Sequence, residues 1–250
     1  MTTLRFIESD LEKWARFSND YNPIHFDKNF AKKFGLDDVV VHGMLGINHI
    51  FRSVETNDVD ESLSIKCVLK KPLPVNSDIK LEKLDSKVRL VDNKSGNMLF
   101  MANVSYSGKW DNKKCYPELY EISNINDKLH ELMRLYPEKK IWILINSIVF
   151  SEYIASHGQF LSREISNWKK KYNHTDDGQF MVMHANHNVF LQQDIVNVTS
   201  HSYVGSLHYS IDKIELVESK NTVYALLRFD ILINNVHMMN IEIGLIAISK

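Results

Sequence analysis

The stretch DYNPIH, residues 20–25, places a carboxylate and an imidazole on either side of an Asn-Pro pair. Proline fixes its own φ angle and disfavours helical geometry in the residue before it, so the chain turns after Asp20. The turn allows the side chains of Asp20 and His25 to converge. A positioned carboxylate and imidazole can carry protons to and from a reacting group. The stretch therefore indicates acid–base chemistry.

A glycine at the start of a predicted helix supplies a third group. The β-branched run VVV, residues 39–41, leads into His42 and Gly43, and an apolar helical segment starts at Met44. Glycine lets a ligand approach the backbone closely, and the first amides of a helix have no intrahelical acceptor. The Gly43 amide, helped by the helix dipole, is a candidate donor to an oxygen that becomes negatively charged.

Taken alone, an Asp-x-Asn-Pro sequence is most often a turn in which the Asp and Asn side chains bond the backbone. The sequence HGML at residues 42–45 favours the catalytic interpretation instead. Between the two, DKNFAKKFG at residues 27–35 predicts a short helix with Asp27 as its N-cap and Gly35 at the C′ position.

Together, DYNPIHFD followed by VHGML resembles the hydratase signature of the MaoC-like, (R)-specific enoyl-thioester hydratases and dehydratases, over residues 14–53. The family pattern commonly begins S-G-D, whereas this chain has Asn at position 19. The resemblance implies that Asp20 and His25 hold a water and exchange the protons. It also implies that the Gly43 amide receives the thioester oxygen, that Asn22 orders the turn, and that no metal or organic cofactor is needed. Which of the pair is the acid stays open, because coupled groups titrate together.

The reaction implied by the resemblance is the reversible hydration of a trans-2-enoyl thioester to an (R)-3-hydroxyacyl thioester, a lyase reaction of fatty acid or polyketide metabolism. The substrate carrier is coenzyme A or acyl carrier protein. Two other functions remain open, because a fold alone does not give a function. One is a non-catalytic acyl-thioester-binding hotdog or partner subunit, and the other is a hotdog thioesterase.

The elements that must position this site form a pattern that occurs twice. Three strand-like pieces are predicted over residues 65–108, and three more over 206–248, where apolar residues alternate with polar ones. A helical apolar stripe precedes each group, and its members are Ile47, Ile50, Phe51 and Val54 in the first half and Ile141, Leu144, Ile145, Ile148 and Val149 in the second.

The repeated pattern predicts an α+β double hotdog, in which two curved antiparallel sheets each wrap a central helix and join side by side. The hotdog name itself rests on the resemblance. Residues 1–112 are predicted to be the MaoC-like hotdog, and residues 117–250 a second, degenerate hotdog without the catalytic motif. The polar segment between residues 111 and 138 contains two prolines, which favours a boundary there. A homodimer is left open.

Other candidate groups have simpler explanations. His184 and His187, with His174 nearby, have no clear third ligand, so their HxxH spacing is weak support for a metal site. Glu152 and His157 repeat the five-residue offset of the first half without an Asn-Pro between them. Chance explains this offset better than a second catalytic pair does, because the two residues lie near the end of an apolar helix that is expected to stop at Gly158.

The composition excludes several function classes. Lys and Arg total 30 against 31 Asp and Glu, and no basic run marks a nucleic-acid surface. The two cysteines, Cys67 and Cys115, have no metal-ligand spacing and favour a reducing compartment. The longest apolar run, residues 141–150, is too short to span a bilayer, and the N-terminus has no signal-peptide pattern. The sequence therefore predicts a cytoplasmic globular protein.

Overall fold

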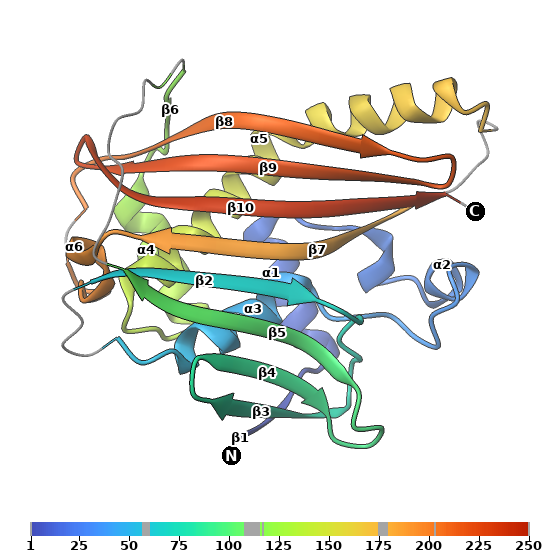
Figure 1. Cartoon of the computed structure of the whole chain (residues 1–250), viewed down its shortest axis with the longest axis horizontal. Coiled ribbons are helices and arrows are strands. Elements are labelled where there is room, and N and C mark those ends of the chain that lie inside the picture. Colours follow the sequence, from blue (N-terminus) through green and yellow to red (C-terminus); the bar gives the residue numbers. More distant parts are fainter. Residues whose placement is uncertain are drawn as a thin grey trace.

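The computed structural model describes residues 2–56, 61–107, 116, 118–174, 180–202 and 204–249. In this part of the chain ten strands form one antiparallel sheet (Figure 1). The strands are β1 (Thr2–Arg5), β2 (Ser62–Leu69), β3 (Asp78–Leu84), β4 (Lys87–Asp92), β5 (Met98–Ser107), β6 (Tyr120–Glu121), β7 (Phe180–Leu191), β8 (Leu207–Glu218), β9 (Thr222–Ile233) and β10 (Val236–Ser249). Their order across the sheet is β1-β3-β4-β5-β2-β7-β10-β9-β8-β6.

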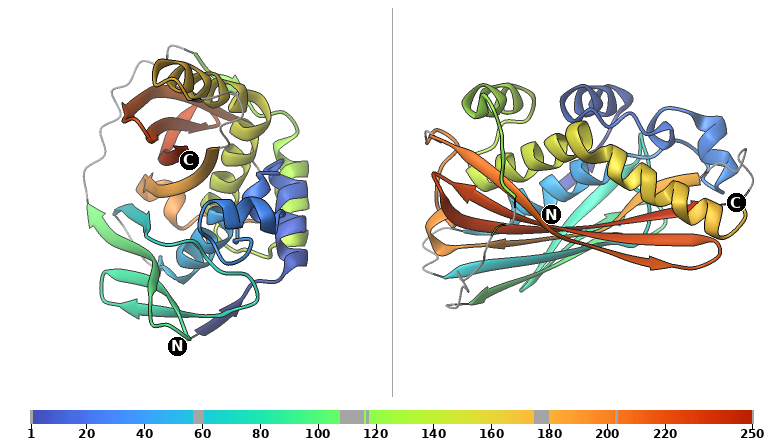
Figure 2. Two further views of the ribbon diagram at one scale, coloured as in Figure 1. Left: turned by 90° about the vertical axis from the view of Figure 1, so that its right-hand side faces the viewer. Right: turned by 90° about the horizontal axis from the view of Figure 1, so that it is seen from above.

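The helices gather on one face of this sheet, as the view from above in Figure 2 shows. They are α1 (Glu8–Ser18), the 3₁₀ turn η1 (Pro23–His25), α2 (Lys28–Lys33), α3 (Gly43–Ser53), α4 (Ile125–Leu135), α5 (Ile141–Lys171) and α6 (Gln193–Val196). Helices α3 and α5 are the two predicted central helices, and every member of both predicted apolar stripes is buried. Helices α1 and α4 pack against α5.

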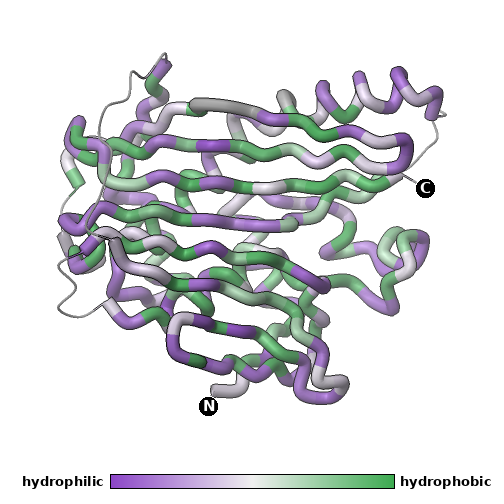
Figure 3. The backbone as a smooth tube through the Cα atoms, in the orientation of Figure 1, coloured by the Kyte–Doolittle hydropathy of each residue, from purple (hydrophilic) through white to green (hydrophobic). Residues whose placement is uncertain are grey.

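The expected double hotdog is confirmed as one continuous sheet. The two halves meet where β2 pairs with β7, from Leu63 opposite Leu191 to Val68 opposite Asn186. Hydrophobic and hydrophilic residues alternate along the strands (Figure 3), as a sheet with one covered face requires. In β9 the predicted inward residues, namely Leu227, Phe229, Ile231 and Ile233, are all buried.

The structure corrects two of the predicted elements and adds a helix to a segment for which none was predicted. The region predicted as three strand-like pieces contains four strands, because β3 and β4 are separated by a tight turn in which Asp85 has a φ of 45°. Part of the polar segment at 111–138 forms α4, whose Leu129 and Leu132 are buried. Helix α5 does not end at Gly158 but continues to Lys171, since Ile165 and Trp168 beyond the glycine are buried in a second apolar cluster.

Other expectations concern the cysteines and the membrane. Cys67 is a buried free thiol, and burial raises its pKa to about 12, so it is unreactive. Cys115 lies outside the described residues. Among the described helices, none combines the length and the hydropathy that crossing a lipid bilayer requires.

Candidate active site

The DYNPIH turn follows directly from the end of α1. Asn19 caps that helix in the left-handed conformation, with a φ of 57°. The next turn, η1, begins at Pro23, and the Asn22 side chain accepts a hydrogen bond from the Ile24 amide at 3.3 Å. Asn is the non-glycine residue best suited to the left-handed region, so it can replace the glycine of the S-G-D pattern without disturbing Asp20.

The turn brings Asp20 and His25 together. One side-chain atom from each of Asp20, His25 and His42 lies within 4.8 Å of the others. The Nδ1–H group of His25 donates to the Val40 carbonyl at 2.7 Å, which leaves Nε2 available to a ligand. Burial lowers the pKa of His25, and the Asp20 charge opposes this shift. His25 is therefore neutral at physiological pH and can accept a proton.

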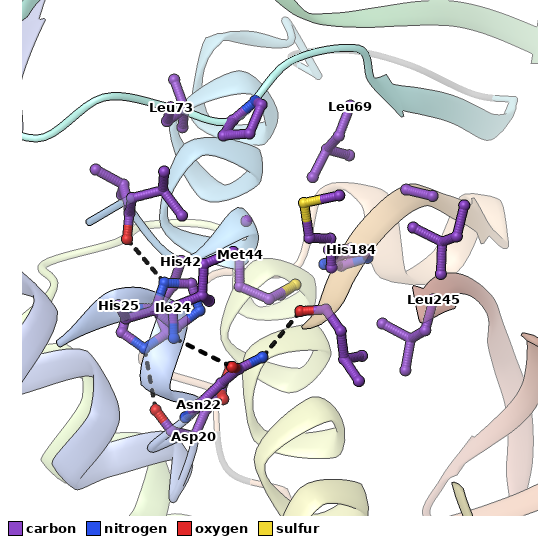
Figure 4. Close-up of a pocket in the computed structure, with 18 of the residues that line it drawn as sticks. Asp20, Asn22, Ile24, His25, His42, Met44, Leu69, Leu73, His184 and Leu245 are labelled. Atoms are coloured by element: carbon purple, nitrogen blue, oxygen red, sulfur yellow. Dashed lines mark hydrogen bonds between the residues drawn. The ribbon is translucent and has the colours of Figure 1, made fainter. Parts of the chain in front are cut away.

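His42 is a member of this site that the sequence did not identify. Its ring stacks on the His25 ring, with centroids 3.7 Å apart (Figure 4). Its Nε2–H group donates to the Asp20 backbone carbonyl at 3.0 Å, and burial lowers its pKa to about 2. His42 thus holds both Asp20 and His25 in place. Its position directly before Gly43 was the only signal in the sequence.

Asn22 connects the turn to the other half of the chain. Its side-chain amide donates to the Val182 carbonyl of β7 at 2.9 Å. The sequence predicted that Asn22 orders the turn, which it does, but this second bond depends on the packing of the two halves. The position of the turn is therefore fixed from both sides.

Gly43 is the first residue of α3, as predicted, and it borders the same cavity. A Cβ atom at this position would lie 2.9 Å from Leu69 Cδ2, 3.0 Å from His184 Cβ and 3.1 Å from His184 Nδ1. Real Cβ atoms rarely approach other atoms so closely, so a larger residue here would require Leu69 and His184 to shift, whereas glycine fits as they are. The Gly43 amide lies at a helix N-terminus, where donors lack intrahelical partners.

A cavity of about 350 Å³ joins these groups. All four predicted site residues line it, namely Asp20, Asn22, His25 and Gly43. Most of its remaining wall is apolar, and the second half contributes Phe150, Ile154, Leu161 and Leu245. An apolar cavity with a few convergent polar groups is typical of a site for a small molecule with a hydrocarbon part.

Two titratable residues of the second half, Glu152 and His157, lie away from the cavity. Glu152 forms an ion pair with Lys128, and the His157 ring packs against Tyr120 and Tyr209. Neither Glu152 nor His157 lines the cavity. Each therefore has a contact outside the cavity, although the helix end at Gly158 that was expected to account for them is wrong.

Asp20, His25 and His42 are close enough to be considered as metal ligands. However, one nitrogen of each imidazole is bonded to a backbone carbonyl, and the two rings stack with only 26° between their planes. Imidazole lone pairs lie in the ring plane, and two nearly parallel planes 3.7 Å apart disfavour a common metal ion. This geometry fits proton exchange better than it fits a tetrahedral metal site.

The left-handed residue before Asp20 gives a prediction about stability. We expect Asn19→Val to lower the free energy of unfolding by about 1–2 kcal/mol, because a β-branched side chain clashes in this backbone region. The matched variant Asn19→Gly should be as stable as the wild type within a few tenths of a kcal/mol. Urea unfolding of the three proteins measures both effects. Equal stability of the Val and Gly variants would contradict the conformation assigned to residue 19.

Comparisons with known proteins agree with the fold. The family model of the MaoC like domain matches residues 1–100. A 40-residue segment is 45% identical to the mitochondrial 3-hydroxyacyl-[acyl-carrier-protein] dehydratase of Arabidopsis thaliana, and it covers 16% of this chain and 24% of that protein. The aligned segment is thus about a quarter of the relative's length.

Two solved structures are similar over nearly the whole chain. A MaoC-like dehydratase covers 98% of this chain and 95% of its own, at 8% identity and a TM-score of 0.52. A conserved hypothetical protein of Mycobacterium tuberculosis with a double hotdog fold covers 100% of this chain and 94% of its own, at 6% identity and a TM-score of 0.52. At these identities the likeness establishes the fold.

Proposed function

Because residues 1–100 carry a MaoC-like domain, we propose that this chain is an enoyl-thioester hydratase or 3-hydroxyacyl-thioester dehydratase. The observation that supports this most is the convergence of Asp20 and His25 beside the Gly43 amide in one largely apolar cavity. A segment also resembles a plant 3-hydroxyacyl-[acyl-carrier-protein] dehydratase.

The proposed chemistry needs two proton carriers and one donor to an oxyanion. In the hydration direction, a water adds to C3 of the enoyl thioester while a proton is delivered to C2. Asp20 and neutral His25 hold the water, take one of its protons and return a proton to C2. Negative charge builds on the thioester oxygen as the C2–C3 double bond is consumed, and the Gly43 amide stabilises it. Water adds without any change in oxidation state of the protein, and no cofactor takes part.

The apolar part of the cavity is the proposed site of the acyl chain. Part of its wall is the apolar side chains of Phe150, Ile154 and Leu161 on helix α5, which can contact a hydrocarbon chain. The proposed division of labour is that residues 1–112 carry the reacting groups and residues 117–250 cover the acyl chain. We expect the carrier to be coenzyme A or acyl carrier protein.

A spectrophotometric assay tests the proposal. Crotonyl and longer trans-2-enoyl thioesters, on coenzyme A and on acyl carrier protein, should lose their enoyl absorbance when the protein is added. The product should be the (R)-3-hydroxyacyl thioester. Tight binding of these thioesters without turnover would instead support a non-catalytic binding protein, and release of the free thiol would support a thioesterase.

Replacing the titratable residues of the second half outside the cavity should leave turnover largely intact. His157→Ala removes an aromatic contact, and Glu152→Gln removes the charge that pairs with Lys128. Both variants should lose some stability, because these groups are partly buried, but not catalysis. Steady-state kinetics with circular dichroism as a folding control measures this. A fall of about a hundredfold in a folded His157→Ala variant would place chemistry in the second half.

A further inference from the structure

Strand β7 contains an irregularity next to the cavity. On β10, Gly244 pairs with Asn186 and Leu245 pairs with His184, so Ala185 is an extra residue without a partner on that strand. Successive side chains of a regular strand point to opposite faces, and residues three apart would therefore face opposite ways. The extra residue changes this alternation. His184 and His187 consequently both point to the helix-covered face, where His187 is fully buried and His184 is half-buried.

A hydrogen bond on the outer face of the sheet stabilises this bulge. The Tyr224 hydroxyl donates to Asn186 Oδ1 at 2.6 Å directly over Gly244. A Cβ atom on Gly244 would lie 1.9 Å from Asn186 Oδ1 and 2.4 Å from the Tyr224 hydroxyl. The glycine is therefore required for the Asn186–Tyr224 bond. The bulge is a defined feature of β7 that sets the direction of His184.

A hydrogen-bonded chain fixes the protons on the two histidines. Asn146 Oδ1 accepts from His187 Nε2–H at 2.8 Å, so His187 Nδ1 is the acceptor for His184 Nε2–H at 3.3 Å. Burial lowers the pKa of His184 to about 4 and that of His187 well below its usual value, so both rings are neutral. A neutral imidazole has one N–H group. With His187 Nδ1 as an acceptor, the one N–H group of His184 is on Nε2, where it bonds His187 and the Asn186 backbone, and Nδ1 keeps its lone pair.

The lone pair lies at the edge of the candidate site. His184 lines the cavity from the β7 side (Figure 4), and its Nδ1 is 3.1 Å from the Cβ position of Gly43. The other side chains that the described second half places in the cavity wall are apolar, among them Phe150, Ile154, Leu161 and Leu245. His184 is thus the polar group of an otherwise apolar second-half wall, and a half-buried acceptor facing the cavity favours a ligand that brings a donor.

We propose that His184 Nδ1 accepts a hydrogen bond from an N–H or O–H group of the bound acyl thioester, and that the second half selects substrates in this way. The inference rests on the proposed function. A ligand with a methylene in place of the donor leaves the acceptor unpaired, and sites of this kind discriminate strongly against such analogues. Two sources of the donor are chemically equivalent here. One is the amide N–H of a pantetheine-type thiol, and the other is a hydroxyl on the acyl chain.

Binding of unreactive thioesters tests the proposal without relying on turnover. Two probes are S-butyryl-N-acetylcysteamine and its match S-(4-oxopentyl) butanethioate, in which a methylene replaces the amide N–H. The third is (R)-3-hydroxybutyryl-N-acetylcysteamine, whose match is the butyryl compound; this pair is measured in proteins that also carry Asp20→Asn, because the proposed reaction would dehydrate the hydroxy ligand. Calorimetry on the wild type should give at least about tenfold tighter binding for one donor ligand than for its match without the donor. In His184→Leu this preference should fall to within about threefold, and in His184→Gln, which keeps an acceptor oxygen, part of it should remain.

If His184→Leu loses the preference for the ligand with the amide N–H, the donor is the thiol amide. If it loses the preference for the 3-hydroxy ligand over the butyryl ligand, the donor is the acyl hydroxyl. An unchanged preference in both pairs in a folded His184→Leu variant overturns the inference. If that variant does not fold, ¹⁵N spectra of histidine-labelled wild-type protein decide. The His184 Nδ1 signal should shift with the donor ligand and stay unchanged with its match, and no shift with either ligand also overturns the inference.

The same experiments separate this inference from the proposed function. A wild type that hydrates enoyl thioesters while His184→Leu keeps every binding preference refutes only the role of His184. A wild type that neither binds nor hydrates any thioester refutes the proposed function, and the role of His184 is refuted with it.

Discussion

Asp20→Asn and His25→Ala should each reduce the turnover of enoyl-thioester hydration by roughly 10² to 10⁴, the range expected for loss of a positioned acid or base. Both side chains line the cavity, and they lie within 4.8 Å of each other. Asparagine keeps the size and the hydrogen-bonding capacity of Asp20 but cannot exchange the proton. Both variants should remain folded, because neither residue belongs to the apolar core.

The two effects should not add. Both groups act on one transition state, so the double variant should be little slower than the more damaged single variant. Each single variant should lose the limb of the pH–rate profile that belongs to the replaced group. In Asp20→Asn the pKa of His25 should fall further, because the opposing Asp20 charge is gone. The limb that reports protonation of His25 should therefore move to lower pH.

Steady-state kinetics on the wild type, both single variants and the double variant measures these effects, with circular dichroism as the folding control. Wild-type turnover in both folded single variants would refute the hydratase proposal. Fully multiplicative losses in the double variant would show that the two residues act in separate steps.

Phe51→Ala should lower the free energy of unfolding by about 3–5 kcal/mol, the usual loss for a fully buried phenylalanine. Phe51 is on α3 and is fully buried. Its ring centroid is 5.3 Å from that of Trp142 on α5 and 5.8 Å from that of His187 on β7. The ring therefore contacts two elements of the other half, and its removal leaves a cavity between the two central helices.

Leu84→Ala is the matched control. Leu84 lies on β3 and is 45% exposed, so its truncation should change the free energy of unfolding by about 0.5 kcal/mol or less. Denaturant unfolding of both variants gives the comparison. Similar losses in the two variants would contradict the assignment of Phe51 to the core that joins the halves.

The parts of the site that the sequence predicted correctly depend on short-range rules. Pro23 restricts its own backbone and that of Asn22, and this local restriction was enough to predict a turn that brings Asp20 toward His25. The start of α3 at Gly43 follows from the change of hydrophobic period after the β-branched run. The apolar stripes of α3 and α5 likewise predicted which helix faces are buried.

The parts that the sequence did not predict depend on contacts between distant residues. His42 bonds the Asp20 carbonyl, and Asn22 bonds Val182, 160 positions away. The bulge in β7 could not be seen in the sequence either, because it exists only in the pairing with β10. Gly158 failed as a helix end because a glycine weakens a helix by only about 1 kcal/mol, which the buried residues on either side offset.

The β2–β7 pairing also determines what would happen if the chain were cut between its halves. Each fragment would carry a long strand whose unpaired N–H and C=O groups form an open edge, and such edges recruit other strands. Two copies of the first fragment could pair through β2, but the resulting dimer would present two DYNPIH turns and no β7. The two fragments together could restore the β2–β7 ladder. Covalent linkage in one chain thus keeps the strand edges from self-pairing and ensures that each motif meets the strand that carries His184.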